Sequence, residues 1–248
     1  MPQKEPNHRH RILLRRAFGI LLLATLLRFP LPAGPQDSSQ SFVLFPKPMP
    51  SGTSNLSLGL AMTIIPRAIV QEGVLPLPMV DVRMRYGLTD HFFLSGHANF
   101  VYVTNQVSLG LGWSHSFGGL SFALEDNVGY WFGFAGFEGF DATAMGLTNY
   151  PSVTVGVVAD NLYLSFRMEA LFSISQHTYF GSASVGRINP KVAGFAFTLA
   201  AEQALWKDNY VIFGTRIQYA LPMYQTWLAF SAFDRWLVFP EVFIGFEL

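Results

Sequence analysis

The chain has 248 residues with 16 basic and 16 acidic side chains, and charged residues make up only 13% of it, against roughly 25% in soluble globular domains. Half of the residues are apolar or aromatic, which excludes intrinsic disorder, and the absence of cysteine excludes disulfides, thiol nucleophiles and cysteine-based metal sites. Residues 1–30 hold six Lys or Arg residues and one Glu, so the rest carries ten basic and fifteen acidic side chains; this balance of −5 excludes a basic nucleic-acid-binding surface.

Residues 1–34 are predicted to be a signal peptide that is removed on export. A basic region precedes the apolar run Ala17–Leu27, whose eleven residues match the core of a secretory signal, whereas a membrane-spanning helix needs roughly 20. Arg15-Arg16 resembles a twin-arginine export signal, but Leu14 stands where that signal usually has Ser or Thr, so ordinary basic-region arginines are the simpler interpretation. If the segment were retained, it would be a membrane anchor.

Residues 35–52 are predicted to be a linker rich in proline and serine. Pro46, Pro48 and Pro50 hold the chain extended and cannot donate backbone hydrogen bonds to a sheet. The segment therefore either connects the signal peptide to the rest of the chain or forms a short N-terminal plug.

From residue 53 onward, apolar side chains alternate with small or polar ones, which is the periodicity of a β-strand. In the first such segment Leu56, Leu58 and Leu60 share one face, and Ser57 and Gly59 lie on the other. The same alternation recurs in residues 80–88, 107–114, 162–169 and 211–218.

Two all-β architectures use this pattern, a soluble barrel or sandwich with an apolar core and a membrane barrel with an apolar outside. The polar face consists mainly of Gly, Ala and Ser with scattered Arg and Glu, which suits a confined lumen better than bulk water. An apolar face on every strand would cause aggregation in water, but it is required in lipid. The sequence therefore favours a transmembrane, up-and-down antiparallel β-barrel formed by residues 53–248.

The barrel is predicted to have twelve strands, with ten or fourteen as alternatives. An even number of strands places the start of the first strand and the end of the last strand on the same side of the membrane, called the near side. Near-side turns are expected at residues 89–91, 117–119, 159–161 and 188–191, and long far-side loops at Ile65–Leu77 and Gly133–Asn149. The predicted strands comprise residues 54–65, 78–88, 92–103, 105–117, 119–132, 150–159, 162–174, 178–188, 192–204, 209–221, 225–233 and 236–248.

The pattern of residues 52–248 resembles bacterial outer-membrane β-barrel proteins as a class. The segment Arg83–Phe92 is similar to their succession of strand, tight turn and strand, and Val242–Leu248 resembles the terminal strand that their assembly machinery recognises. That terminal signal normally closes with Phe or Trp, and Leu248 departs from it. The resemblance implies a location in the outer membrane, with the lipid bilayer and the barrel assembly machinery as partners.

Charged side chains at lumen-facing positions are candidate functional residues, because an Arg on the lipid face would cost about 2 to 4 kcal/mol at the midplane. Four arginines against five carboxylates nearly cancel, which indicates either ion pairs that fill the lumen or a weakly selective filter. We expect a narrow, porin-like channel for small solutes; the alternative is a nonconducting barrel that presents its far-side loops to a partner. No cofactor and no metal ion is expected. The predicted lumen-lining residues are Asp81, Arg83, Arg85, Glu125, Arg167, Glu169, Glu202, Arg216 and Glu241.

A lipid hydrolase is the less favoured hypothesis. Ser95, His97 and Asn99 share one strand face, but residues two apart on a strand lie roughly 7 Å from each other, too far for a direct hydrogen bond. Residues 112–118 faintly resemble the motif of outer-membrane phospholipases, yet Ser116 directly follows His115, so the two point to opposite faces, and the Asn of the motif is missing. The chain is therefore predicted not to be an enzyme.

Overall fold

The computed structural model describes residues 42–69, 75–137, 140–188, 190–206, 209–222, 226–227 and 235–248. The predicted signal peptide, residues 1–34, lies outside these residues, as does the first part of the predicted linker. Within the described ranges no helix is both long and apolar enough to cross a membrane.

Eleven strands occur in the described residues, and ten of them close into a barrel. Neighbouring strands pair antiparallel, and the pairing of β6 with β7 joins the two edges of the sheet. The predicted up-and-down antiparallel barrel is confirmed, but the predicted number of twelve strands is wrong and the alternative of ten is correct. The strands are β1 (Ser54–Ile65), β2 (Leu75–Gly87), β3 (Phe92–Phe100), β4 (Thr104–Phe117), β5 (Leu120–Phe137), β6 (Phe140–Ala159), β7 (Leu162–Phe180), β8 (Ala183–Ile188), β9 (Lys191–Trp206), β10 (Asn209–Ala220) and β11 (Leu237–Glu247).

The extra strand β8 lies in line with β9 along the same edge of β7. Both strands pair antiparallel with β7, and the pairs Gln176↔Ile188 and Ser173↔Lys191 keep one register. The chain therefore keeps its direction between β8 and β9, and the turn predicted there is wrong. Pro190 lacks a backbone N–H and therefore interrupts the ladder. Because proline is also common in turns, the sequence suggested a turn at this position.

Two predicted strands are not barrel strands. Residues 178–188 comprise the end of β7, a turn and β8. The strand predicted at residues 225–233 is excluded by the direct pairing of β10 with β11. In that segment Thr226 and Trp227 lie in a 3₁₀ turn, and its other residues lie outside the described part of the chain. The sequence pattern placed Trp227 on a predicted strand, but its side chain is buried, with 2% exposed, and does not lie on the face of a barrel strand.

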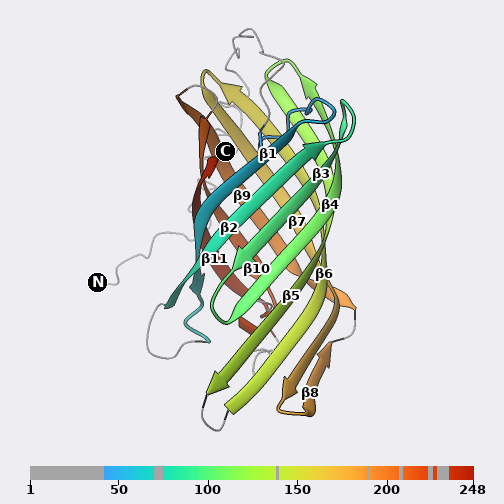
Figure 1. The fold of residues 1–248 in the computed structure, drawn as a ribbon, viewed down its shortest axis with the longest axis vertical. Helices are drawn as coiled ribbons and strands as arrows, with labels where there is room; N and C mark the ends of the chain where they lie inside the picture. Colours follow the sequence, from blue (N-terminus) through green and yellow to red (C-terminus); the bar gives the residue numbers. More distant parts are fainter. Residues whose placement is uncertain are drawn as a thin grey trace, which may run out of the picture. The chain divides into compact units, whose positions relative to one another are not determined.

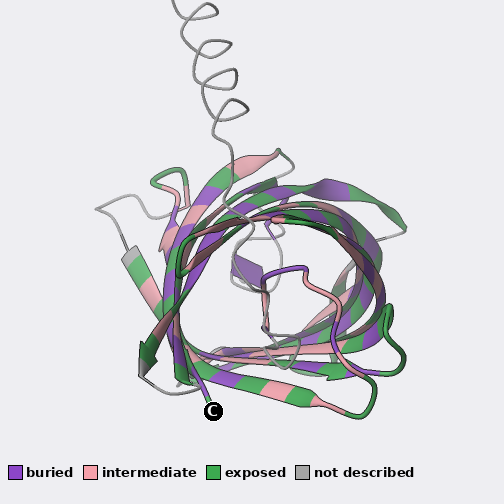
Figure 2. Ribbon diagram, turned by 90° about the horizontal axis from the view of Figure 1, so that it is seen from above, coloured by how far each residue is buried: buried purple, intermediate pink, exposed green. Residues whose placement is uncertain are grey.

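Large apolar side chains face outward from the barrel. On β1, Leu58 and Leu60 are 48% and 61% exposed, whereas Ala61 and Thr63 are 2% and 0% exposed. Exposed large apolar residues occur on all eleven strands, and Figure 2 shows exposed and buried residues alternating along them. The predicted arrangement, with apolar rows outward and small or polar rows inward, is confirmed.

The chain enters and leaves the barrel at one end, called the near end. There β1 begins, and the Leu248 amide donates to the Leu56 carbonyl. The turns predicted at residues 89–91, 117–119 and 159–161 connect strands at this end, and Gly118 and Asp160 adopt φ angles of 61° and 54° in two of them. Residues 42–50, called the plug, lie inside the ring of strands (Figure 2).

At the opposite, far end β5, β6 and β7 are longer than a membrane-spanning strand requires. They have 18, 20 and 19 residues, whereas roughly 9 to 11 residues span a bilayer as a tilted strand. β5 and β6 stay paired as far as Phe137↔Phe140, so the loop predicted at Gly133–Asn149 is wrong, and most of it is a hairpin. The hairpins β5–β6 and β7–β8 extend past the other strands at the lower end of Figure 1.

Candidate functional site: the barrel lumen

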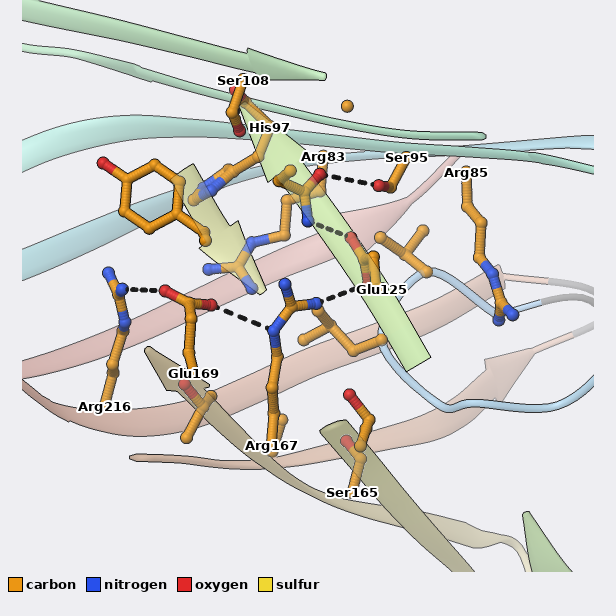
Figure 3. A pocket seen from close by; sticks show the side chains of 18 of the residues that line it. Arg83, Arg85, Ser95, His97, Ser108, Glu125, Ser165, Arg167, Glu169 and Arg216 are labelled. Carbon is orange, nitrogen blue, oxygen red and sulfur yellow. Dashed lines mark hydrogen bonds and ion pairs between the residues drawn. The ribbon is translucent and has the colours of Figure 1, made fainter. Parts of the chain in front are cut away.

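Four charged side chains from β5, β7 and β10 form a chain across the lumen, called the ionic belt (Figure 3). Arg167 donates to Glu125 from Nη1 at 2.7 Å and to Glu169 from Nε at 3.1 Å, and Arg216 Nη2 donates to the other Glu169 oxygen at 2.5 Å. The signs alternate and cancel, so each buried charge lies against an opposite one. Removing one member would leave an uncompensated charge inside the barrel.

Neutral side chains extend the belt to β3. Asn127 donates to Glu125 Oε1 at 2.5 Å, and Ser95 donates to Asn127 Oδ1 at 2.8 Å. Because Arg167 binds Glu125 Oε2, both oxygens of this carboxylate have a donor. The polar chain therefore ties β3, β5, β7 and β10 together from the inside.

A second ionic group lies on β2 and β3. Arg83 donates to Asp81 twice, from Nε at 2.7 Å and from Nη2 at 3.1 Å, and His97 Nε2 lies 2.9 Å from Asp81 Oδ2. The Arg83 guanidinium also lies over the ring of Phe243, 4.4 Å from its centroid. The two hydrogen bonds to Asp81 and the cation–π contact with Phe243 hold the Arg83 guanidinium against the barrel wall.

The structure places all nine predicted lumen-lining residues on the inner face of the barrel. Six of them form the ionic belt or the ion pair of Asp81 with Arg83. Glu241 accepts a hydrogen bond from Thr63 at 2.7 Å. The remaining two, Arg85 and Glu202, are not members of the belt and bind the plug instead.

Three consecutive plug amides bind the carboxylate of Glu202. Oε1 accepts from Val43 at 3.0 Å and from Leu44 at 2.8 Å, and Oε2 accepts from Phe45 at 2.5 Å. Successive backbone N–H groups that converge on one anion form a nest. Glu202 is 0% exposed, so these amides supply the hydrogen bonds that a buried carboxylate requires.

Arg85 binds the same plug segment through its carbonyl groups. Nη1 donates to Phe45 O at 2.8 Å and to Phe42 O at 3.5 Å, and Nη2 donates to Ser114 at 3.2 Å. The guanidinium lies 3.9 Å from the ring centroid of Phe93. In the described part of the chain no carboxylate lies within salt-bridge distance of Arg85. The plug backbone is therefore a main partner of this buried cation.

Aromatic rings complete the closure of the near end. Phe42 and Phe45 of the plug are 1% and 0% exposed. Their rings pack on Tyr163 with centroids 4.1 and 5.2 Å apart, and Phe42 also packs on Tyr210 at 5.1 Å. Polar and apolar contacts thus both hold the plug inside the barrel.

Two tryptophans fill the lumen towards the far end. Trp131 and Trp227 are 1% and 2% exposed and belong to one buried apolar cluster. A Cβ atom at Gly133 would collide with the indole of Trp227, and one at Gly146 would collide with Trp131. These two glycines lie in the segment 133–149, which was predicted to be a loop, and they leave room for the two rings inside the barrel.

A cavity of about 100 Å³ lies among the plug, the ionic belt and the wall. A water molecule needs at least about 10–15 Å³ of such space, so the cavity has room for several waters. Barrels of eight strands have interiors that side chains fill, and this ten-stranded barrel follows the same rule. In the described part of the chain, the plug and the inward side chains therefore fill most of the lumen.

The residues considered for hydrolysis do not form a catalytic trio. Ser95 donates to Asn127 and His97 contacts Asp81, and no hydrogen bond joins Ser95 to His97 among the described residues. Asn99 is 3% exposed and lies opposite Asp81 in the β2–β3 pairing.

Nor do the motif residues on β4 meet. The His115 ring stacks on Trp113 with centroids 5.9 Å apart, whereas the Ser116 hydroxyl lies 2.7 Å from that of Ser121. Among the described residues no group of three or more His, Asp or Glu side chains could hold a metal ion.

Two lumen residues, Glu247 and Trp227, were not predicted from the sequence. Glu247 accepts from Val43 at 3.2 Å and from Asn55 at 3.3 Å, and its even spacing from Glu241 could have placed it inside. No sequence signal indicated that Trp227 folds back into the lumen.

No protein-family model matches the sequence, and no curated protein matches it. Among solved structures, the fold is similar to the translocator domain of autotransporter NalP from Neisseria meningitidis (10% identity, TM-score 0.43, 79% of this chain and 88% of that chain). It is also similar to the outer membrane protease OmpT (7%, 0.46, 84% and 99%) and to outer membrane phospholipase A (8%, 0.34, 81% and 93%), both from Escherichia coli. Identities this low concern the barrel architecture alone. The predicted resemblance to outer-membrane β-barrels is confirmed at the level of the fold by the closed barrel itself.

Proposed function

We propose that this protein is an outer-membrane β-barrel with a closed lumen that presents the hairpins β5–β6 and β7–β8 beyond the membrane surface. The observation that carries the proposal is the filled interior: the plug, the ionic belt and the two tryptophans leave a cavity of about 100 Å³. Among the described residues, this filling leaves little room for a solute path through the interior.

The outward face supports the membrane location. Exposed Leu, Phe, Val, Ile and Met side chains occur on all eleven strands, and such a surface is stable in lipid but aggregates in water. A closed barrel also satisfies its backbone hydrogen bonds between strands, as the interior of a bilayer requires.

The long strands support presentation at the surface. The 18 residues of β5 extend roughly 60 Å along the strand, or roughly 45 Å along the barrel axis at the usual tilt, against a hydrocarbon core of about 30 Å. The first barrel strand begins and the last one ends at the near end, so the extra length of β5, β6 and β7 projects at the far end. In barrels of this kind the far end faces the outside of the cell.

A gated channel is the second candidate. The plug is not a strand of the barrel, and its backbone bonds to Glu202 and Arg85 can break without opening the ladder. Withdrawal of the plug would expose a narrow lumen in which Arg83, Arg167 and Arg216 alternate with carboxylates, so the open channel would be weakly selective for the charge of the ion.

Single-cysteine labelling tests the proposed location and orientation, because the chain has no cysteine of its own. Gly136→Cys lies in the β5–β6 hairpin, where a Cβ meets open space, and Asp90→Cys lies in an exposed near-end turn. A membrane-impermeant maleimide should label Gly136→Cys on intact cells and Asp90→Cys only after the outer membrane is permeabilised. Equal labelling of both variants, or labelling of Asp90→Cys alone, would contradict the proposal.

A further inference from the structure

A groove of about 700 Å³ crosses the outward face of the barrel over β4, β5, β6 and β7, and residues of β3 and β9 line its two ends. The antiparallel register explains its shape. Leu124, Val153 and Met168 lie opposite one another on successive strands and form one wall, and their side chains are 46%, 39% and 49% exposed. The next row towards the far end contains the smaller side chains of Asp126, Pro151 and Ala170. A row of short residues beside a row of large ones produces a trench.

The barrel ladder is interrupted at the floor of this groove. β6 and β7 pair at Asn149↔Phe172 and again at Ser152↔Glu169, in the same register, but not at the two positions between them. Pro151 lies in the interruption and has no N–H to donate to β7. The floor is therefore a local opening in the ladder and not a slip of one strand.

Asp126 provides a carboxylate on this otherwise apolar outward surface. It is exposed, and Asn149 Nδ2 donates to its Oδ1 at 2.5 Å. No basic side chain of the described residues lies within salt-bridge distance of it. The neighbouring carboxylates Glu125 and Glu169 also border the groove, but both are bound inward by Arg167. A lipid-facing ionisable group without an opposite charge is unfavourable and marks a functional site.

From these observations we propose that the groove binds an amphipathic molecule of the bilayer that carries an apolar chain and a primary ammonium group. The chain lies in the trench against Leu124, Met168 and Phe172, and the ammonium binds the carboxylate of Asp126. A volume of about 700 Å³ falls within the range of small-molecule sites, roughly 300–1,000 Å³. A carboxylate selects a cation and repels an anionic head group, so the site discriminates by charge as well as by shape. The inference rests on the proposed membrane location.

Photo-crosslinking in phosphatidylcholine vesicles tests the site. Three probes share one 16-carbon chain with a diazirine and end in an amine, a hydroxyl or a carboxylate, and mass spectrometry of peptides locates the crosslinks. We expect the amine probe to label the peptides of the groove about fivefold more than the carboxylate probe, since an ion pair at a partly solvated site contributes roughly 1 kcal/mol. Asp126→Asn should remove this preference, and Asp160→Asn, with the same charge change in a near-end turn, should retain it.

A second variant tests the shape of the groove independently of the charge. Ala170→Leu fills the floor and should lower labelling of the groove by all three probes, while labelling elsewhere on the outward face stays unchanged. Migration of the unheated protein on gels reports whether each variant is folded. Equal labelling by the three probes, or an amine preference that survives Asp126→Asn, would overturn this site and leave the membrane barrel intact. A chain that remains in solution, with no crosslink on any outward strand, would overturn the membrane location and this inference together.

Discussion

Arg85 on β2 and Glu202 on β9 bind the same segment of backbone, Arg85 through the carbonyl oxygens of Phe42 and Phe45 and Glu202 through the amides of Val43, Leu44 and Phe45. The carbonyl groups and amides of this one short segment thus supply hydrogen bonds to a buried cation and to a buried anion. Two side chains that the sequence predicts to line the lumen therefore also hold the plug.

Glu202→Gln should loosen the plug. A glutamine has one acceptor oxygen, and its NH₂ group would face amide donors, so part of the nest would be unsatisfied. Because a hydrogen bond to a charged group contributes about 1.5–3 kcal/mol, exchange of the Val43–Phe45 amides with solvent deuterium should become at least about tenfold faster. Glu241→Gln removes another inward carboxylate, one that accepts from Thr63 of the barrel wall, so it serves as the control. Equal exchange rates in both variants would argue against the nest.

Arg167→Gln should destabilise the folded barrel strongly. The change leaves Glu125 without its arginine in the interior, and breaking a buried ion pair typically costs about 3–5 kcal/mol. The double variant Glu125→Gln/Arg167→Gln retains the neutral pair of Glu169 with Arg216 and should recover part of this loss. Urea-dependent unfolding in detergent, followed by tryptophan fluorescence, measures both. A double variant less stable than Arg167→Gln would disprove charge compensation in the belt.

Gly133→Ala should be more destabilising than Gly136→Ala on the same strand. A methyl group at Gly133 meets the Trp227 indole, and overpacking of this kind costs about 1–3 kcal/mol, whereas at Gly136 the same methyl group meets open space. The same urea titration compares the two variants. If their midpoints coincide, Trp227 does not fill the lumen at this position.

The purified barrel should not deacylate phospholipid, because Ser95 and His97 are engaged by Asn127 and Asp81 and do not meet. Mass spectrometry of mixed micelles that contain phosphatidylethanolamine measures lysophospholipid and free fatty acid. Release of fatty acid that disappears in Ser95→Ala would show that the hydroxyl is a nucleophile after all.

Parity along each strand predicted the inner and outer faces correctly, because a β-strand alternates its side chains whatever its partners are. Leu58 and Leu60 therefore face outward, and Arg167 and Arg216 face inward, as the alternation predicts. The predicted number of strands was wrong partly because proline is common in turns but also occurs where a strand is only interrupted. Pro190 suggested a turn, whereas β8 and β9 pair with β7 in one register.

The partners of the inward side chains could not be predicted. Glu125 and Arg167 are 42 residues apart, and Glu202 and Phe45 are 157 apart, so their contacts depend on the closure of the whole ring. A plug was one of the two alternatives that the sequence predicted for residues 35–52. Its binding by Arg85 and Glu202 could not be predicted, because it depends on the register of β2 and β9.

Single-channel recording in planar lipid bilayers tests the closed lumen most directly. Insertion is verified by flotation of the same preparation with vesicles. The wild-type barrel is predicted to give no discrete conductance steps, whereas the double variant Arg85→Leu/Glu202→Gln, which removes the two charged partners of the plug backbone, is predicted to give steps. Stable conductance steps from the wild-type barrel would contradict the closed lumen on which the proposed function depends.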